Sequence, residues 1–409
     1  MKIHVTDRIT DDWMILFSHL RQALQPEEEG WFPQILQLTQ HQWKNVVEKA
    51  KKHSVLPLLY ETLKKEQSLP PDLFEYVQNM SRRTVQQNYR LLYHTNYIVK
   101  LLDTSSVSVV VLKGVATADL YPYPELRKSG DIDLLLPNPE DLSKACSLME
   151  AKGYLLKGKL HSDHHVVYES KEGIFIELHS RLAEPFDNPR VNHYLQKLIL
   201  QYNTYKEVRD ILGCQLPVPQ FAHHAYYLLV HMLQHFMDSG FGLKLLCDWV
   251  VLWNRETKKD EQDLFMRLVD ESGMRSFAEC VTAICTSYLG LEEEKVCFLK
   301  VGAINDEDIK DMLMEILEAQ EFGKSDSSRM IILRGTSPIY YIKQLHRQMQ
   351  LNYPKYNKQI LLWPFLWACT IQKFLHNNRK VRRTSLYSIL KKTHARSRKN
   401  WYSKYLPSN

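Results

Sequence analysis

The chain has 409 residues, of which 44% are apolar and 24% charged, with 14 glycines and 17 prolines. These proportions are ordinary for a folded protein and exclude a collagen-like, coiled-coil or largely disordered chain. No apolar run reaches the roughly 18 residues that a membrane-spanning helix needs, so we expect no transmembrane segment. The seven cysteines include no CxxC pair. This argues against a disulfide framework or a zinc ribbon and favours the reducing cytoplasm.

Positive charge is concentrated at the C-terminal end of the sequence. The whole chain has 53 basic and 47 acidic residues, but no acidic residue follows Asp326. Residues 329–409 hold 17 of the basic residues, which leaves 36 basic against 47 acidic residues in the rest of the chain. A basic extension of this kind attracts an anion. We expect its partner to be RNA, an anionic membrane surface at which the protein is peripheral, or the acidic body of the same chain.

The first quarter of the sequence has the apolar spacing of helices. In residues 41–65, Trp43, Val46 and Ala50 recur at intervals of three and four, and a second pattern of this kind covers 81–103. Such spacing places apolar side chains on one face of a helix. We therefore assign 1–104 to an N-terminal helical region.

The pattern changes near residue 105, where β-branched runs replace helical spacing. The segments 106–114 (SVSVVVLKG) and 132–137 (IDLLLP) predict two buried strands, with a short helix at 115–121 between them. A longer helix is expected over 138–153, with Asn138 as its N-cap and Pro139 in its first position. Two further strands, 164–170 and 173–179, are joined by a short turn. We assign 105–215 to a β/α core.

Helical spacing returns after the core. Residues 221–237 and 242–256 are strongly apolar on one side, and further helical patterns run to about residue 320. We assign 216–328 to a C-terminal helical domain and 329–409 to a basic, aromatic extension. The sequence thus predicts an α+β fold, in which a small mixed β-sheet is flanked by N-terminal and C-terminal helical regions.

Three carboxylates in the predicted core form the strongest candidate for chemistry. Asp131 and Asp133 are two apart at the start of a strand, so their side chains point to the same face. Glu177 is an acidic residue in a strand that otherwise has a buried pattern. Carboxylates held side by side against a core repel each other, and a divalent cation removes that cost. Three carboxylates on adjacent strands can hold two metal ions for phosphoryl transfer.

The turn upstream of the aspartates completes this candidate site. The segment VVVLKG leaves a strand at Gly114 and enters a helix, and backbone amides at a helix start, with Lys113 beside them, suit a phosphate. Arg127, just before the acidic pair, is a further cation for phosphate charge. An Asp-x-Asp triplet or a Lys-Gly pair alone is a weak signal. The combination within about 70 residues is much stronger.

These motifs resemble the uncharacterised nucleotidyltransferase family, within the DNA polymerase β-like nucleotidyltransferase superfamily. That family combines a Lys-Gly turn, an Arg before Gly-Asp-x-Asp-Leu-Leu, and a later Glu-Leu-His, here VLKG, LRKSGDIDLLL and IELH. The resemblance covers roughly 35–330, including the helical flanks. It implies Asp131, Asp133 and Glu177 as metal ligands, and Lys113 and Gly114 in the turn that binds the nucleotide phosphates. The implied cofactor is Mg²⁺ or Mn²⁺, with a nucleoside triphosphate as substrate.

The resemblance favours a metal-dependent enzyme that transfers a nucleoside monophosphate from a nucleoside triphosphate, such as ATP, to an acceptor hydroxyl and releases pyrophosphate. It departs from the wider superfamily at Val115, where Gly or Ser usually follows the glycine. A more distant resemblance to toxin and abortive-infection nucleotidyltransferases leaves RNA or protein open as the acceptor. A catalytically inactive protein that binds nucleotides or RNA is the remaining alternative.

Weaker candidates come mostly from the C-terminal helical domain. His231 and His235 are four apart but lack the Glu of the HExxH zinc motif, which favours a structural or substrate-lining role. Lys244 and Asp248 have the spacing of a helical ion pair. The resemblance places these four residues in a motif that faces the cleft. Two interpretations remain for His164, His165 and His179: each residue either lines the wall of the site or is a structural histidine.

The extension contains the apolar, tryptophan-rich segment 359–375 (QILLWPFLWACTIQKFL). It is too short to span a bilayer and Pro364 interrupts it. A helix buried against the acidic body is one interpretation. A surface that binds a membrane or RNA is the other, because aromatic side chains adjoin basic residues.

Overall fold

The computed structural model describes residues 9–27, 38–158, 165–186, 189–238, 240–320 and 359–377, with a few residues between the last two ranges. Its centre is a mixed five-stranded sheet with the order β1-β2-β5-β4-β3. Helices precede and follow this sheet along the chain, so the predicted α+β class is confirmed. The strands are β1 (Val110–Val111), β2 (Asp131–Leu135), β3 (Leu155–Gly158), β4 (His165–Glu169) and β5 (Phe175–His179).

The pairing of the central strands sets the direction of the side chains. β2 runs parallel to β5, with Asp133 opposite Glu177, whereas β1 is antiparallel to β2 and β4 is antiparallel to β5. Alternate residues of a strand point to opposite faces. Asp131 and Asp133 therefore share one face of the sheet, and Ile132 and Leu134 share the other.

The apolar face of the sheet is covered by two helices. Ile132, Leu134 and Ile176 belong to a buried cluster with residues of α4 (Pro71–Thr104) and α6 (Leu142–Ala151). Asn138 caps the turn that leads into α6, as predicted, although the first turn there is a 3₁₀ helix. α5 (Val115–Ala118) follows β1 directly.

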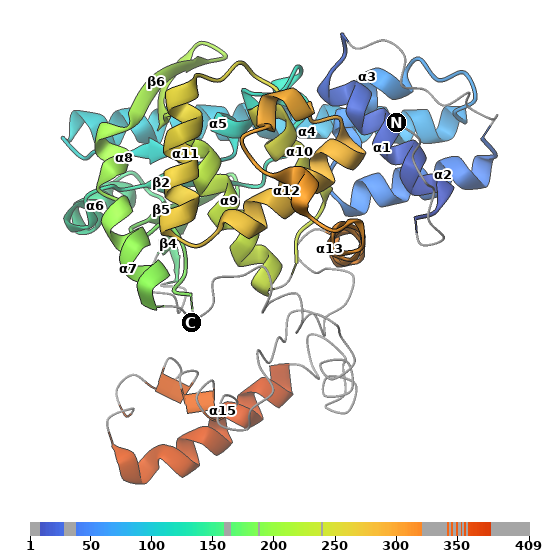
Figure 1. Cartoon of the computed structure of the whole chain (residues 1–409). Coiled ribbons are helices and arrows are strands. Elements are labelled where there is room, and N and C mark those ends of the chain that lie inside the picture. The colour runs from blue at the N-terminus through green and yellow to red at the C-terminus, as the bar shows by residue number, and fades with distance from the viewer. Residues whose placement is uncertain are drawn as a thin grey trace.

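The other face of the sheet meets the larger apolar core. Leu112 and Leu135 belong to a cluster that continues through α9 (Phe221–Asp238) and α10 (Leu243–Trp253). Figure 1 shows helices α1 to α3 at one end of the molecule and the strands of the sheet towards the other. The remaining helices are α1 (Asp11–Leu24), α2 (Gln40–Lys52), α3 (Tyr60–Leu63), α7 (Pro189–Leu198), α8 (Gln201–Thr204), α11 (Lys259–Glu271), α12 (Arg275–Leu289) and α13 (Asp306–Ala319).

Two strand features were not predicted. β3 pairs with β4 at the edge of the sheet. A separate hairpin is formed by β6 (Lys206–Ile211) and β7 (Cys214–Pro219), whose two-residue turn has positive φ at Leu212 and Gly213. The predicted boundary between residues 215 and 216 falls inside β7. The apolar residues of the run 106–114 are buried as expected, but only Val110 and Val111 form β1.

The C-terminal extension is described only in part. α15 (Trp363–Asn377) begins with Pro364 in its first turn, where proline is tolerated. Leu366 is buried, whereas Leu361 and Phe365 are 96% and 67% exposed, so the buried-helix interpretation does not hold for those two side chains. Nearly all of the basic residues of the extension lie outside the described residues, and its anionic partner stays a prediction. None of the helices in the described ranges combines the length and apolar character that crossing a membrane requires.

Candidate active site

The three predicted carboxylates meet on one face of the sheet. Asp133 of β2 lies opposite Glu177 of β5 in the parallel pair, and Asp131 is two residues before Asp133. One carboxylate oxygen from each of the three lies within 4.8 Å of the other two. This grouping has the oxygen chemistry that a divalent cation such as Mg²⁺ prefers.

Asp133 gives a structural test of whether a cation fits among these carboxylates. Its side chain is completely buried. Its Oδ1 is 3.1 Å from Lys113 Nζ and 3.0 Å from His179 Nε2. Within the described residues, its Oδ2 is buried without a hydrogen-bond partner. Burying a carboxylate oxygen without a hydrogen-bond partner costs free energy of folding. A cation bound to Asp133 Oδ2 would remove that cost, so the oxygen atoms of this site fit a divalent cation.

The glycine bend lies directly beside the first aspartate. Gly114 has φ +67°, a conformation that favours glycine, and a Cβ added there would lie 3.4 Å from the backbone oxygen of Asp131. The bend between β1 and α5 is therefore packed against the start of β2. The predicted Lys-Gly turn and the predicted carboxylates therefore lie next to each other in the fold.

Lys113 points into the carboxylates. Its Nζ is 3.9 Å from Asp131 Oδ2 as well as 3.1 Å from Asp133 Oδ1. Burial alone would lower the pKa of Lys113, but the charges of Asp131 and Asp133 outweigh burial and raise that pKa well above its usual value. The ammonium therefore stays charged and balances the two aspartates. The predicted contact with nucleotide phosphates stays a prediction.

His179 joins two of the carboxylates. Its Nε2 is 3.0 Å from Asp133 Oδ1 and 3.3 Å from Glu177 Oε2. Burial opposes the charged ring, but the hydrogen bonds to Asp133 and Glu177 overcome burial and raise the pKa of His179 to about 9. The same contact lowers the pKa of Glu177 although burial works against it. The structure thus brings His179 into contact with the carboxylates.

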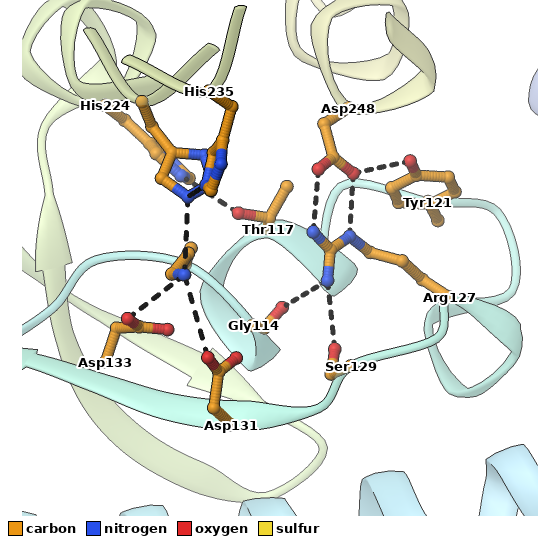
Figure 2. A network of polar contacts seen from close by, with 12 residues as sticks. Gly114, Thr117, Tyr121, Arg127, Ser129, Asp131, Asp133, His224, His235 and Asp248 are labelled. Atoms are coloured by element: carbon orange, nitrogen blue, oxygen red, sulfur yellow. Dashed lines mark hydrogen bonds and ion pairs between the residues drawn. The ribbon is translucent and has the colours of Figure 1, made fainter. Parts of the chain in front are cut away.

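Arg127 lies in a buried network of polar contacts. Its guanidinium is buried and donates from Nε and Nη2 to the two oxygens of Asp248, at 2.7 Å each. Its Nη1 donates to Ser129 Oγ at 2.9 Å and lies 3.4 Å from the Gly114 carbonyl oxygen. Figure 2 shows the guanidinium between Asp248 on one side and Gly114 and Ser129 on the other. These contacts give Arg127 a positioning role, and its predicted contact with a nucleotide phosphate stays a prediction.

Asp248 is held by more than Arg127. Tyr121 donates its hydroxyl to Asp248 Oδ1 at 2.6 Å. Burial raises the pKa of Tyr121 well above its usual value, and the neighbouring Asp248 charge adds to this rise. The predicted pairing of Asp248 with Lys244 along the helix is thus replaced, on the Asp248 side, by contacts with the loop before β2.

The two candidate histidines of α9 lie next to Lys113. His231 Nε2 is 3.4 Å from Lys113 Nζ and 3.0 Å from His235 Nε2. Burial lowers the pKa of both histidines, to about 3 for His235, and the Lys113 charge adds to this effect. Lys244 contributes to the same lowering. Both rings are therefore neutral at physiological pH and face the site as hydrogen-bonding groups.

Sequence reasoning missed several residues of the site. Tyr227 lies one helical turn before His231, with ring centroids 6.1 Å apart, and burial raises its pKa. The spacing i, i+4, i+8 of Tyr227, His231 and His235 was the signal that would have found it. Thr117 is hydrogen-bonded at 3.4 Å to His224, as Figure 2 shows, which ties α5 to α9. Tyr121 and Ser129 had no distinguishing pattern in the sequence.

Comparison with known proteins agrees with this geometry at the level of the family. The model of a family described as uncharacterised nucleotidyltransferase matches residues 39–290. The chain therefore belongs to this uncharacterised nucleotidyltransferase family, as its motifs predicted. Membership implies a transferase with a nucleotide substrate, and nucleotidyltransferases generally use a divalent metal.

The crystal structure of an antigenic nucleotidyltransferase-like protein from Paracoccidioides brasiliensis is similar to this chain at 15% sequence identity and a TM-score of 0.29. The similarity covers 49% of this chain and 93% of that protein's chain. The search of curated proteins gives no match.

Proposed function

We propose that the protein transfers a nucleoside monophosphate from a nucleoside triphosphate to an acceptor hydroxyl, with release of pyrophosphate. In this reaction the acceptor oxygen forms a bond to the α-phosphorus, while the bond between that phosphorus and the oxygen of the leaving pyrophosphate breaks. The observation that carries the proposal is the convergence of Asp131, Asp133 and Glu177 within 4.8 Å, next to the Gly114 bend.

The three carboxylates would bind the divalent cation. Asp131, Asp133 and Glu177 would be the ligands for Mg²⁺ or Mn²⁺. This assignment is supported by Asp133 Oδ2, which has no hydrogen-bond partner among the described residues. When bound, such a cation neutralises phosphate charge and lowers the pKa of the attacking hydroxyl. Asp131 and Glu177 have side chains 39% and 25% exposed, so a substrate reaches them from solvent.

The remaining residues of the site keep this arrangement in place. The Lys113 ammonium lies 3.1 Å from Asp133 and 3.9 Å from Asp131, and it is the group that we assign to the charge of the triphosphate. The ion pair of Arg127 with Asp248 fixes the loop that leads into Asp131, and the Arg127 guanidinium also lies 3.4 Å from the Gly114 carbonyl oxygen. His231 and His235 line the side of the site formed by α9.

Label transfer tests the proposal directly. The full chain is incubated with each α-labelled nucleoside triphosphate, Mg²⁺ or Mn²⁺, and total cell extract, and the label is followed into RNA, protein, lipid and sugar fractions. We expect one fraction to become labelled, with pyrophosphate released in equal amount. The labelled fraction then identifies the class of acceptor, including the RNA or protein expected of a toxin-like enzyme.

Variants tie the transfer to the carboxylates. Asp131→Asn and Glu177→Gln keep the shape of the side chains and remove the charge, so transfer should fall by at least about 100-fold. Asp263→Asn, which changes an exposed carboxylate on α11, serves as the matched control and should keep full transfer. Transfer that survives in both site variants, or no labelling in any fraction with the wild type, would refute the proposed function.

A further inference from the structure

A second group of ligand atoms lies beside the three carboxylates. One ligand atom from each of His165, Glu177 and His179 lies within 4.8 Å of the other two. His165 is on β4, and the other two are on β5. Glu177 is therefore common to this group and to the group formed with Asp131 and Asp133.

The register of the sheet builds this group. His165 is directly opposite His179 in the antiparallel pair of β4 and β5, so both side chains project from the same face. Their ring centroids are 5.2 Å apart. Glu177 is two residues before His179 and shares that face. Three side chains on two paired strands are held by backbone hydrogen bonds, which makes the arrangement rigid.

The distances within the group suit a metal ion. Glu177 Oε2 and His179 Nε2 are 3.3 Å apart. Adjacent ligand atoms of a tetrahedral ion with bonds of about 2.0–2.1 Å are separated by about 3.3 Å. His179 is only 6% exposed, so its ring is fixed by packing. A cation that replaces the proton between these two atoms keeps them at their present separation.

The donor chemistry distinguishes this group from the carboxylate group. Two imidazoles and one carboxylate form a set that suits Zn²⁺, Co²⁺ or Mn²⁺, whereas Mg²⁺ prefers oxygen ligands alone. We propose that His165, Glu177 and His179 form a separate position for a transition-metal cation of this class. Its part in catalysis rests on the proposed function, but its ability to bind metal does not.

The shared residue couples the two positions. Glu177 is a ligand in both sets, so a metal held by the histidines also fixes the carboxylate that faces Asp131 and Asp133. Metal binding at His179 also removes the hydrogen bond from its Nε2 to Asp133 Oδ1, which is 3.0 Å long in the structure. The transition-metal position thus controls the charge and orientation of the carboxylates that would hold Mg²⁺.

Cobalt provides a probe that does not depend on enzyme activity. The full chain is freed of metal with a chelator and titrated with Co²⁺ while its visible absorption is recorded in the presence of excess Mg²⁺. We expect one equivalent to give the absorption bands of Co²⁺ bound to nitrogen and oxygen. His165→Ala and His165→Gln should weaken Co²⁺ binding by at least about 10- to 100-fold. His193→Ala on α7, an exposed histidine, is the matched control and should bind as the wild type does.

The outcomes separate this inference from the proposed function. Equal Co²⁺ affinity in wild type and in both folded His165 variants would overturn the inference, as would absorption bands that disappear only in His231→Ala. Circular dichroism establishes that each variant is folded. Asp131→Asn should lose nucleotide transfer and keep the Co²⁺ spectrum. A chain that transfers no nucleotide but shows the His165-dependent spectrum would refute the proposed function alone.

Discussion

Arg127 and Asp248 form a buried ion pair with two contacts of 2.7 Å each, although 121 positions separate them in the chain. Arg127 belongs to the loop before β2, and Asp248 belongs to α10. The pair therefore joins the loop before β2 of the central sheet to helix α10. Because Nη1 of the same guanidinium reaches the Gly114 carbonyl, one side chain links the helical domain, the glycine bend and the approach to Asp131.

Removal of Asp248 is predicted to destabilise the fold strongly. Asp248→Ala leaves the Arg127 guanidinium buried without its partner, which should cost about 3–5 kcal/mol in the free energy of unfolding. Arg127→Lys should also be destabilising, because an ammonium cannot make the two parallel contacts. Urea denaturation of the purified variants measures both effects.

An exposed pair provides the control for this measurement. Lys259 and Asp263 are 2.8 Å apart on α11, with side chains 75% and 58% exposed. Asp263→Asn should change the free energy of unfolding by less than about 1 kcal/mol. A change of that small size in Asp248→Ala would mean that the buried pair does not hold the two parts together.

Arg127 shows where sequence reasoning reaches its limit. Alternation along a strand is local information, so the shared face of Asp131 and Asp133, and the convergence of Glu177 on them, could be predicted. An arginine before Gly-Asp-x-Asp has the same sequence whether it meets a phosphate or a buried carboxylate. The observed partner, Asp248, lies 121 positions away on α10, and this contact becomes visible only when the chain has folded.

The hairpin of β6 and β7 was missed for a related reason. Its turn places Leu212 and Gly213 at φ 49° and 82°. Asn-Gly or Asp-Gly is the usual signal for such a turn, and leucine in this conformation is uncommon. Gly213 alone was too weak a signal to divide the segment into two strands. The helices, in contrast, follow from apolar spacing repeated over several turns, which tolerates single exceptions.

Gly114→Ala is predicted to harm transfer more than stability. A methyl group fits at 3.4 Å from the Asp131 carbonyl oxygen, so the cost comes from the backbone conformation, with φ +67° and ψ −114°, and should be about 1–3 kcal/mol. The bend carries Lys113 and touches β2, so a shift of this backbone should lower the transfer rate by more than about 10-fold. Gly213→Ala has a φ of +82° in a turn with open space and is the matched control. Equal transfer rates in the two folded variants would contradict this prediction.

Lys113→Met is predicted to make the protein more responsive to divalent cations. The Lys113 ammonium lies 3.1 Å from Asp133 Oδ1 and 3.9 Å from Asp131 Oδ2, where it competes with a metal for the same carboxylates. Without that charge, the two carboxylates repel each other until a cation binds. The variant should therefore unfold at lower temperature without metal and gain more from Mg²⁺ than the wild type gains.

Thermal unfolding with and without Mg²⁺ measures this difference. Lys49→Met is the control, because Lys49 pairs with Asp12 at 3.0 Å far from the site in the sequence and in the fold. We expect the Mg²⁺-induced rise in Tm to be at least about 3 °C larger in Lys113→Met than in Lys49→Met, since about 1 kcal/mol shifts Tm by a few degrees. Equal rises would show that the ammonium and the metal do not compete.

Stability is predicted to fall on mild acidification because of buried histidines. Burial lowers the pKa of His19 and His223 to about 4, and that of His224 to about 3. In the unfolded chain these groups take up protons near pH 6.5, so below that pH the unfolded state is favoured. Each histidine should remove about 1.4 kcal/mol per pH unit between about pH 6 and its folded pKa. His179, with its pKa raised to about 9, acts only above pH 6.5 and does not cancel this loss.

Urea denaturation at pH 7.5, 6 and 5 tests the effect of these histidines. The wild type should lose several kcal/mol between pH 6 and 5, because His231 and His235, whose pKa burial also lowers, add to these three groups at about 1.4 kcal/mol each. His19→Gln removes one titrating group from α1, far from the carboxylates, and should reduce that loss by about 1.4 kcal/mol, roughly a fifth of it. His193→Ala, which changes an exposed histidine, should leave the slope unchanged. A free energy of unfolding that stays constant from pH 7.5 to 5 would show that the buried rings accept protons without cost, which contradicts the burial that lowers their pKa.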